Sequence, residues 1–199
     1  MLSSIHPFGE RSRNNSFGRT ATAHVLGGAA GGAVLGVLAG ALGIAINAAL
    51  APSDTVRTAI VLAAAVVALA LEATSRERML PTRTRQVNEN WIQTYRGWVY
   101  AGGFGAELGF GISTIITTTL VHLTVIAMVL VGSFPLAVLI GAIFGLVRGA
   151  TVLTARKVDS PESLRHFHQR LDQLRSRSRS GAVATLTAAN IIGVVGVVL

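Results

Sequence analysis

Apolar stretches long enough to cross a membrane alternate with short polar segments along the chain. The longest uncharged one, residues 24–51, contains no Asp, Glu, Lys or Arg, and a helix needs about 20 apolar residues to cross the hydrocarbon core. We therefore expect an all-α, polytopic integral membrane helix bundle with about five transmembrane helices, in the stretches 24–51, 57–73, 98–131, 136–155 and 181–199.

The polar segments divide the chain into six parts. These are a basic N-terminal segment (1–23), a first transmembrane hairpin (24–73), a basic loop with an aromatic interfacial stretch (74–97), a second, glycine-rich transmembrane hairpin (98–155), a basic amphipathic helix with a linker (156–180), and a C-terminal transmembrane helix (181–199). The alternative that residues before Ala51 form a cleaved signal peptide is disfavoured, because the apolar region of a signal peptide is only about 7–15 residues long.

Basic residues cluster between the apolar stretches. Of the 17 Lys and Arg residues, three precede residue 20, five lie between Arg76 and Arg96, and seven lie between Arg156 and Arg179. Cytoplasmic loops carry an excess of such residues, so the pattern predicts a cytoplasmic N-terminus and an external C-terminus. The two hairpins, each followed by a basic segment, are either a two-fold hairpin repeat or two unrelated hairpins.

Composition supports a membrane location and excludes some chemistry. Apolar residues make up 51% of the chain and charged residues 13%, which is unusual for a soluble domain. The net charge of +8 suits a bilayer with anionic headgroups, and no nucleic-acid-binding fold accompanies it. The absence of Cys excludes disulfides, thiolate metal sites and thiol nucleophiles. The abundance of Arg, Ala, Gly and Val points to a bacterium and hence to its plasma membrane.

Glycines recur at intervals of four in three of the apolar stretches. They are Gly28, Gly32, Gly36 and Gly40 in the first, Gly105 and Gly109 in the third, and Gly141 and Gly145 in the fourth. Small residues at this spacing share one helix face and let another helix approach closely in lipid. The pattern predicts helix contacts, either within one subunit or between subunits of a homo-oligomer or a membrane-protein complex.

The third stretch is too long for one upright crossing. Residues 98–131 would extend about 51 Å as a straight helix. We expect a kink or break among its glycines, so that residues 98–111 are either a re-entrant piece or part of a kinked helix.

Three ionisable residues within the second hairpin form a candidate intramembrane polar site. Glu107 and Arg148 lie at similar depth on adjacent spans, and charges inside a bilayer normally find partners or water. They are expected to form an ion pair at the mouth of a cavity, or a purely structural pair, or to snorkel independently. His122 lies deeper, where it would relay protons or donate one hydrogen bond.

Two segments are expected at the cytoplasmic surface. Trp91, Tyr95 and Trp98 have helical spacing and, with Tyr100, predict an interfacial aromatic anchor. Ser160 and Pro161 open a second predicted helix. Its apolar face is formed by Leu164, Phe167, Leu171 and Leu174, and its other faces by Arg165, Arg170, Asp172 and Arg175. This helix is expected to lie on the membrane surface or to pair with a partner helix.

The segment YRGWVYAGGFGAELGFGISTIITTT, residues 95–119, resembles the glycine-broken opening helix of the cytochrome c biogenesis and thiol-disulfide electron-carrier membrane family. The chemistry of that family resides in paired membrane cysteines, which this chain lacks. The resemblance therefore implies a related helix-packing scaffold and no electron relay.

The sequence favours a small non-enzymatic membrane protein without cofactor or metal. The leading hypothesis is transport of a small solute or ion through the glycine-rich bundle, because Glu107, Arg148 and His122 lie in or beside its broken segment. The alternative is a non-transporting scaffold or assembly subunit of a larger complex. Convergence of the three residues on one hydrated cavity would favour transport, and closed packing would favour the scaffold.

Overall fold

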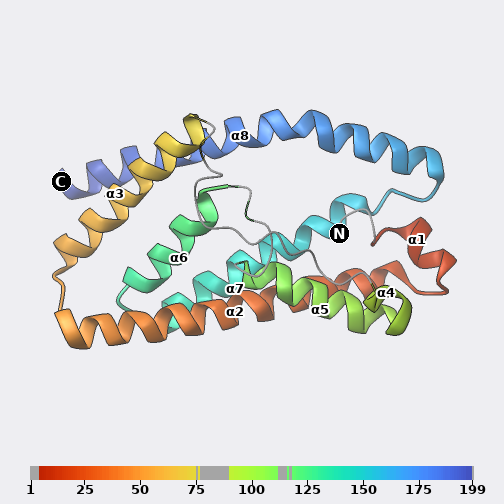
Figure 1. Cartoon of the computed structure of the whole chain (residues 1–199), viewed down its shortest axis with the longest axis horizontal. Helices are drawn as coiled ribbons and strands as arrows, with labels where there is room; N and C mark the ends of the chain where they lie inside the picture. Colours follow the sequence, from red (N-terminus) through yellow and green to blue (C-terminus); the bar gives the residue numbers. More distant parts are fainter. Residues whose placement is uncertain (1–4, 75, 77–89, 112–115, 117, 199) are drawn as a thin grey trace.

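Helices form every element of the computed structural model, which describes residues 5–74, 76, 90–111, 116, 118 and 119–198 (Figure 1). The elements are α1 (Pro7–Ser12), α2 (Phe17–Leu50), α3 (Asp54–Ala73), α4 (Trp91–Thr94), α5 (Gly97–Phe110), α6 (Leu120–Leu130), α7 (Phe134–Ala150), the 3-10 turn η2 (Thr151–Ala155) and α8 (Pro161–Val198). The all-α class is thereby confirmed. Much of the predicted basic loop 74–97 lies outside the described residues.

Among the described residues, three helices are long and apolar enough to cross a membrane. They are Phe17–Leu50, Asp54–Ala73 and the continuous segment Phe134–Ala155, while α6 is a shorter apolar helix. Large apolar side chains project outward from all three, among them Leu38, Leu42, Val66, Val67, Ile143 and Val147. Outward-facing aliphatic side chains are stable in lipid, and in water they would form an unusually large apolar surface. Both observations support a membrane protein.

The turns between helices use residues suited to a sharp reversal. Ala51 ends α2 in the left-handed conformation, and Ser53 caps α3 by accepting a hydrogen bond from the Val56 amide. Gly132 has a φ of 72°, which a residue without Cβ adopts without strain. Pro135 then lies in the first turn of α7, where its missing N–H is not needed. Each turn joins two helices that reverse direction.

Helix α2 packs between α5 and α7 through its glycines (Figure 1). On the α7 side, a Cβ added to Gly36 would lie only 2.5 Å from the carbonyl oxygen of Ala137. On the α5 side, a Cβ on Gly31 would lie 2.9 Å from Ala106 Cα. The glycines predicted to pack lie at these contacts within one chain, except that Gly40 lies against the Phe134 side chain. Backbone therefore contacts backbone along both faces of α2.

Helix α8 is one continuous helix, and it packs mainly on α3 (Figure 1). Ala182 and Leu186 are buried there, and Arg179 donates hydrogen bonds of 2.9–3.0 Å to the carbonyl oxygens of Glu72 and Ala73. The linker that was predicted to follow the amphipathic helix within residues 156–180 is therefore helical. Arg179 satisfies carbonyls that the end of α3 leaves without helical partners, which fixes α8 at that level.

The predicted break in the third apolar stretch lies at Gly111. Helix α5 ends at Phe110, Gly111 has a φ of 75°, and α6 begins only at Leu120. The predicted helix through the aromatic anchor is also interrupted, because Tyr95 is extended between α4 and α5. Tyr95 and Trp98 remain exposed. Trp91 stacks on Phe104, with ring centroids 6.0 Å apart, so the four aromatic residues do not form one stripe.

We predict that Gly36→Ala destabilises the fold. Its Cβ would meet the backbone of α7, which has no flexible side-chain atom to move aside, and overpacking of this kind costs about 1–3 kcal/mol. Thermal unfolding in detergent micelles should show a lower melting temperature. Gly181→Ala is the control, because nothing lies within 4 Å of its new Cβ. Equal melting temperatures of the Gly36→Ala and Gly181→Ala variants would contradict the backbone contact between α2 and α7.

Candidate functional site

Helix α5 ends at Phe110 beside α7, and the next helix, α6, begins only at Leu120. Arg148 of α7 lies at the end of α5, since a Cβ on Gly111 would be 3.4 Å from its Nη1. The guanidinium carbon lies 5.3 Å from the centroid of the Phe144 ring. Arg148 Nη1 is buried and donates no hydrogen bond to any of the described residues. Phe144 and the end of α5 therefore surround this cation.

Glu72 of α3 lies at the other side of the interruption, at the beginning of α6. Its Oε2 accepts hydrogen bonds from the Thr119 amide at 3.0 Å and the Thr119 hydroxyl at 2.9 Å, and a longer one from the Thr118 hydroxyl. The side chain is only 3% exposed. Glu72 therefore does not need to reach the water at the interface, because the Thr119 amide and the Thr118 and Thr119 hydroxyls supply the donors that water would otherwise provide.

The two charges match the helix ends beside which they lie. A helix N-terminus carries partial positive charge and favours an anion, and a C-terminus favours a cation. Glu72 stands at the N-terminus of α6, and Arg148 stands at the C-terminus of α5. Each charge therefore stabilises a helix end that the break at Gly111 creates.

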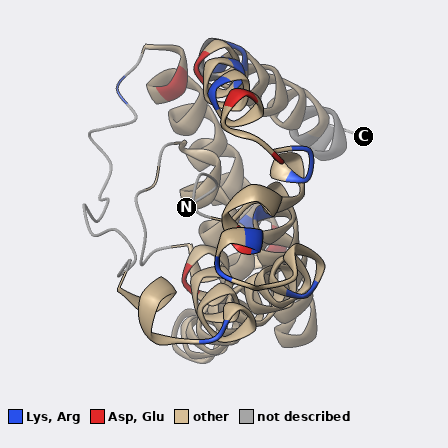
Figure 2. Cartoon of the chain, turned by 90° about the vertical axis from the view of Figure 1, so that its right-hand side faces the viewer, with Lys and Arg blue, Asp and Glu red and all other residues tan. Residues whose placement is uncertain are grey.

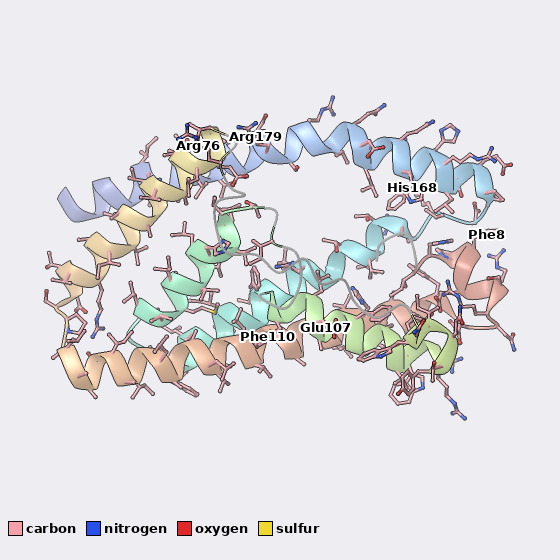
Figure 3. The ribbon with its side chains drawn as sticks, in the orientation of Figure 1. Phe8, Arg76, Glu107, Phe110, His168 and Arg179 are labelled. Atoms are coloured by element: carbon pink, nitrogen blue, oxygen red, sulfur yellow. The ribbon has the colours of Figure 1, made fainter. Side chains whose placement is uncertain are left out.

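The residues predicted as an intramembrane polar site are all half-buried and lie on three helices. Glu107 lies on α5, His122 on α6 and Arg148 on α7. Figure 3 shows Glu107 and Phe110 on α5. The ion pairs between described residues are those of Glu10 with Arg13 and of Asp54 with Arg57. Pairing of Glu107 with Arg148, and a role for His122, stay predictions.

A second buried carboxylate, Glu10, ties α1 to the bundle. Its Oε1 accepts hydrogen bonds from the Tyr100 hydroxyl and, at 2.6 Å, from Arg13, and its Oε2 accepts one from the Thr20 hydroxyl at 3.0 Å. Glu10 and Tyr100 are both fully buried. Tyr100 is therefore not part of an interfacial anchor, because its hydroxyl joins α5 to α1. We call Glu10, Arg13, Thr20 and Tyr100 the α1 cluster.

His6 forms the beginning of α1. Its Nδ1 accepts a hydrogen bond from the Gly9 amide at 3.1 Å, and the side chain is 5% exposed. Burial lowers the pKa of His6, and the nearby charge of Arg13 lowers it further. Glu10 opposes this change, while His168 of α8 adds to it. Since only neutral imidazole can accept the bond, α1 requires His6 to be uncharged.

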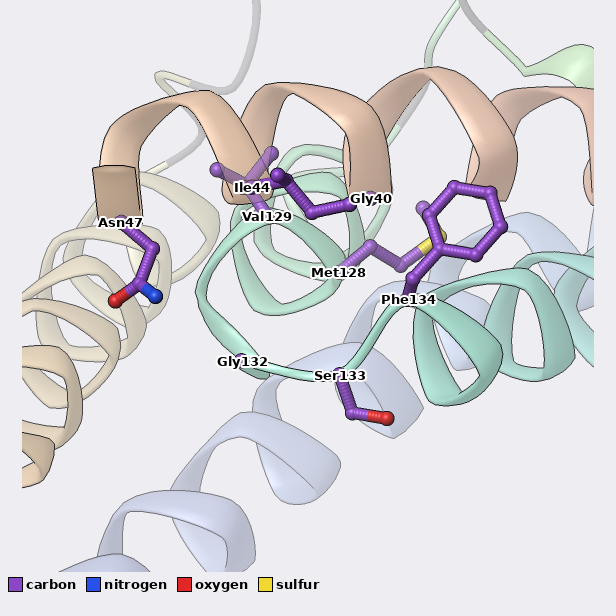
Figure 4. Close-up of a pocket in the computed structure, with 9 residues that line it drawn as sticks. Gly40, Ile44, Asn47, Met128, Val129, Gly132, Ser133 and Phe134 are labelled. Atoms are coloured by element: carbon purple, nitrogen blue, oxygen red, sulfur yellow. The ribbon is translucent and has the colours of Figure 1, made fainter. Parts of the chain in front are cut away.

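A third polar contact lies beside the turn between α2 and α3. Arg57 donates a 2.5 Å hydrogen bond to Asn47 Oδ1, which joins α3 to α2. Asn190 instead donates to the Leu186 carbonyl of its own helix. A pocket of about 70 Å³ lies beside Asn47 between α2, α6 and α7, with Ile44, Met128 and Phe134 in its wall (Figure 4). Glu107, His122 and Arg148 do not line it.

Sequence reasoning missed both buried carboxylates. Glu10 lies in a polar N-terminal segment without apolar periodicity, so nothing in its neighbourhood marks it as buried. Glu72 is the last charged residue of an apolar stretch, where snorkelling and burial give the same sequence pattern. The threonines at 117–119 were the available signal for Glu72, because hydroxyl groups within an apolar stretch are suitable donors to a carboxylate.

No protein-family model, curated protein or solved structure matches the chain. In the part of the chain that the structure describes, His, Asp and Glu do not form a group of three or more that is placed to hold a metal ion. The function must therefore be argued from the geometry of the helices themselves.

We predict that Glu72→Gln destabilises the region around α6. The amide keeps the size of the side chain but removes the charge, and hydrogen bonds to charged groups contribute about 1.5–3 kcal/mol. The melting temperature in micelles should fall. Glu162→Gln, at an exposed position in the first turn of α8, is the matched control. A variant at residue 72 that melts like the control would show that the carboxylate contributes no stability.

Acidification is expected to release α1. The lowered pKa of His6 means that its neutral form favours the docked state above the ordinary value of 6.5, and that this contribution is lost as pH falls through the lower pKa of the folded protein. Hydrogen exchange of residues 8–13, corrected for the intrinsic effect of pH, should accelerate on acidification. His6→Asn should abolish the effect, because Asn caps a helix at every pH. Persistence in that variant would assign the effect to another group.

Proposed function

We propose that the chain is a non-enzymatic, multi-pass protein of a bacterial plasma membrane that acts as a scaffold or assembly subunit and moves no solute. It crosses the bilayer five times, with the N-terminus inside and the C-terminus outside, and contacts anionic headgroups on the cytoplasmic side. It associates with a second copy of itself or with another membrane protein.

The observation that carries this proposal is the direct backbone contact of α2 with both α5 and α7. At Gly31 and Gly36 the neighbouring backbones leave no room even for a methyl group. A conduit for solutes between these helices would require a gap lined by polar groups. The backbone contacts of α2 with α5 and α7 leave no such gap along the line where these helices meet.

Two features support the five crossings. Helix α6 is a short apolar helix, and residues 112–130 contain no Asp, Glu, Lys or Arg. The last part of α8 carries Ile191 and Ile192, which are 59% and 72% exposed and suit a lipid environment. Figure 2 views the end where α1 and the beginning of α8 lie, and Lys and Arg positions appear on several segments there, as the positive-inside rule expects.

Transport is the second candidate, and the interrupted helix favours it. Broken helices in transporters place helix ends at the substrate site near the middle of the bilayer. Here Arg148 Nη1 is buried beside such an end and has no hydrogen-bond partner among the described residues. A rearrangement that opens α5 and α6 around this cation would be required, because the glycine contacts hold the α2 seam closed.

Reconstituted protein distinguishes the two candidates. Liposomes that contain the folded protein should pass protons and a panel of small cations, anions and neutral solutes no faster than empty liposomes. In native-membrane nanodiscs the protein should instead be isolated in a fixed stoichiometry with itself or another membrane protein. Flux that is present in the wild type and lost in Arg148→Ala, with Arg156→Ala as control, would overturn the scaffold in favour of transport.

A further inference from the structure

The first half of α8 has an amphipathic surface that its neighbours leave largely open. Contacts of α8 with the bundle are made mainly on α3, near Arg179, Ala182 and Leu186. Before that level, Leu174 is 48% exposed and most charged residues are exposed. We call residues 161–178 the α8 arm; Figure 1 shows it running away from the end of α3.

The arm cannot both remain straight and lie flat on the bilayer. Arg179 holds α8 at the end of α3, and the helix has no interruption there. If the apolar half of α8 crosses the bilayer, as in the proposed function on which this inference rests, the arm leaves the membrane along the same axis. At 1.5 Å per residue it extends about 27 Å beyond Arg179. An arm of this kind presents its surface to the cytoplasm.

The apolar residues of the arm follow the spacing of a coiled coil. Leu164, Phe167, Leu171 and Leu174 are separated by three, four and three residues, which are the intervals between the a and d positions of a heptad. Half-burial of the first three and exposure of Leu174 leave this seam available to a second helix. The seam spans about two heptads, so binding should be weak and reversible.

Charge identifies the partner. Arg170 and Arg177 occupy positions that flank the seam, whereas Glu162 and Asp172 fall on the outer face. Two copies in one bilayer have the same orientation, so their arms would pack parallel. A parallel pair would place Arg170 opposite Arg175 of the second copy, and like charges across such a seam are destabilising. His168 also flanks the seam; it lies on the part of α8 near α1, where Figure 3 labels His168 and Phe8, and its charge contributes to lowering the pKa of His6. Arg170 and Arg177 therefore remain for a partner with acidic flanks.

We propose that the α8 arm is a docking site for an amphipathic helix of another protein, with apolar residues at its a and d positions and Glu or Asp beside them. The arm and the partner helix form a short two-stranded coiled coil on the cytoplasmic side. This contact gives the scaffold its specificity for one class of partner.

The test uses the full chain in phosphatidylcholine nanodiscs and two labelled helical probe peptides. Both peptides carry Leu at a and d; one has Glu and the other Lys at the flanking positions. Fluorescence anisotropy should show that the Glu peptide binds at least about tenfold more tightly, and that salt weakens it. The double variant R170E/R177E should reverse the preference. Arg165→Glu, on the outer face, should leave it unchanged.

Equal binding of the two peptides, or of neither, overturns the docking site. A membrane-bound arm is the other outcome, and the absence of native Cys permits a clean assay for it. A dye on Phe167→Cys in nanodiscs with anionic lipid should not be quenched by a lipid-borne quencher; quenching there overturns the proposal. A dye on Ile143→Cys, 53% exposed on α7, should be quenched. If the dye on Ile143→Cys is not quenched, the proposed placement of α7 in the membrane is overturned instead.

Discussion

The close approach of α2 to two neighbouring helices is the constraint on which the rest of the structure depends. Lipid tails are as apolar as the side chains that face them, so association of helices in a bilayer relies on packing rather than on the removal of apolar surface from water. Glycine provides that packing by removing the side chain altogether, and at Gly31 and Gly36 even one carbon atom is too many. The same contacts that hold α2, α5 and α7 together close the seam between them, which links the stability of the bundle to its lack of a conduit.

Features set by local periodicity were predictable from the sequence. Apolar stretches gave α2, α3 and α7, the glycine interval gave the faces that touch, and the excess length of residues 98–131 required the break found at Gly111. Whether the stripes join helices of one chain or of two was left open, because spacing fixes a face but not its neighbour. The structure places these glycines at contacts within one chain.

The polar contacts that organise the ends of the bundle could not be predicted in the same way. Glu10 meets Tyr100 across 90 residues of sequence, and Glu72 meets Thr119 across 47. No local sequence pattern identifies such a distant partner, because the residues adjacent to a carboxylate in the chain do not show whether it is buried or exposed. The helical continuity of α8 was missed for a related reason. Ser and Arg at 176–180 are typical of a linker, but the hydrogen bond from Arg179 to the end of α3 stabilises the helical conformation there.

The break at Gly111 and the charges beside it need not imply a moving part. A helix that ends inside a bundle leaves carbonyl groups without partners, and the next helix leaves amide groups, so each end requires a charge or a hydrogen bond wherever water is absent. Glu72 meets this requirement at α6 with direct hydrogen bonds. Arg148 approaches it at α5 but leaves Nη1 without a partner among the described residues. The two ends of the interruption are therefore stabilised differently, by direct hydrogen bonds to a carboxylate at α6 and by a cation beside an aromatic ring at α5.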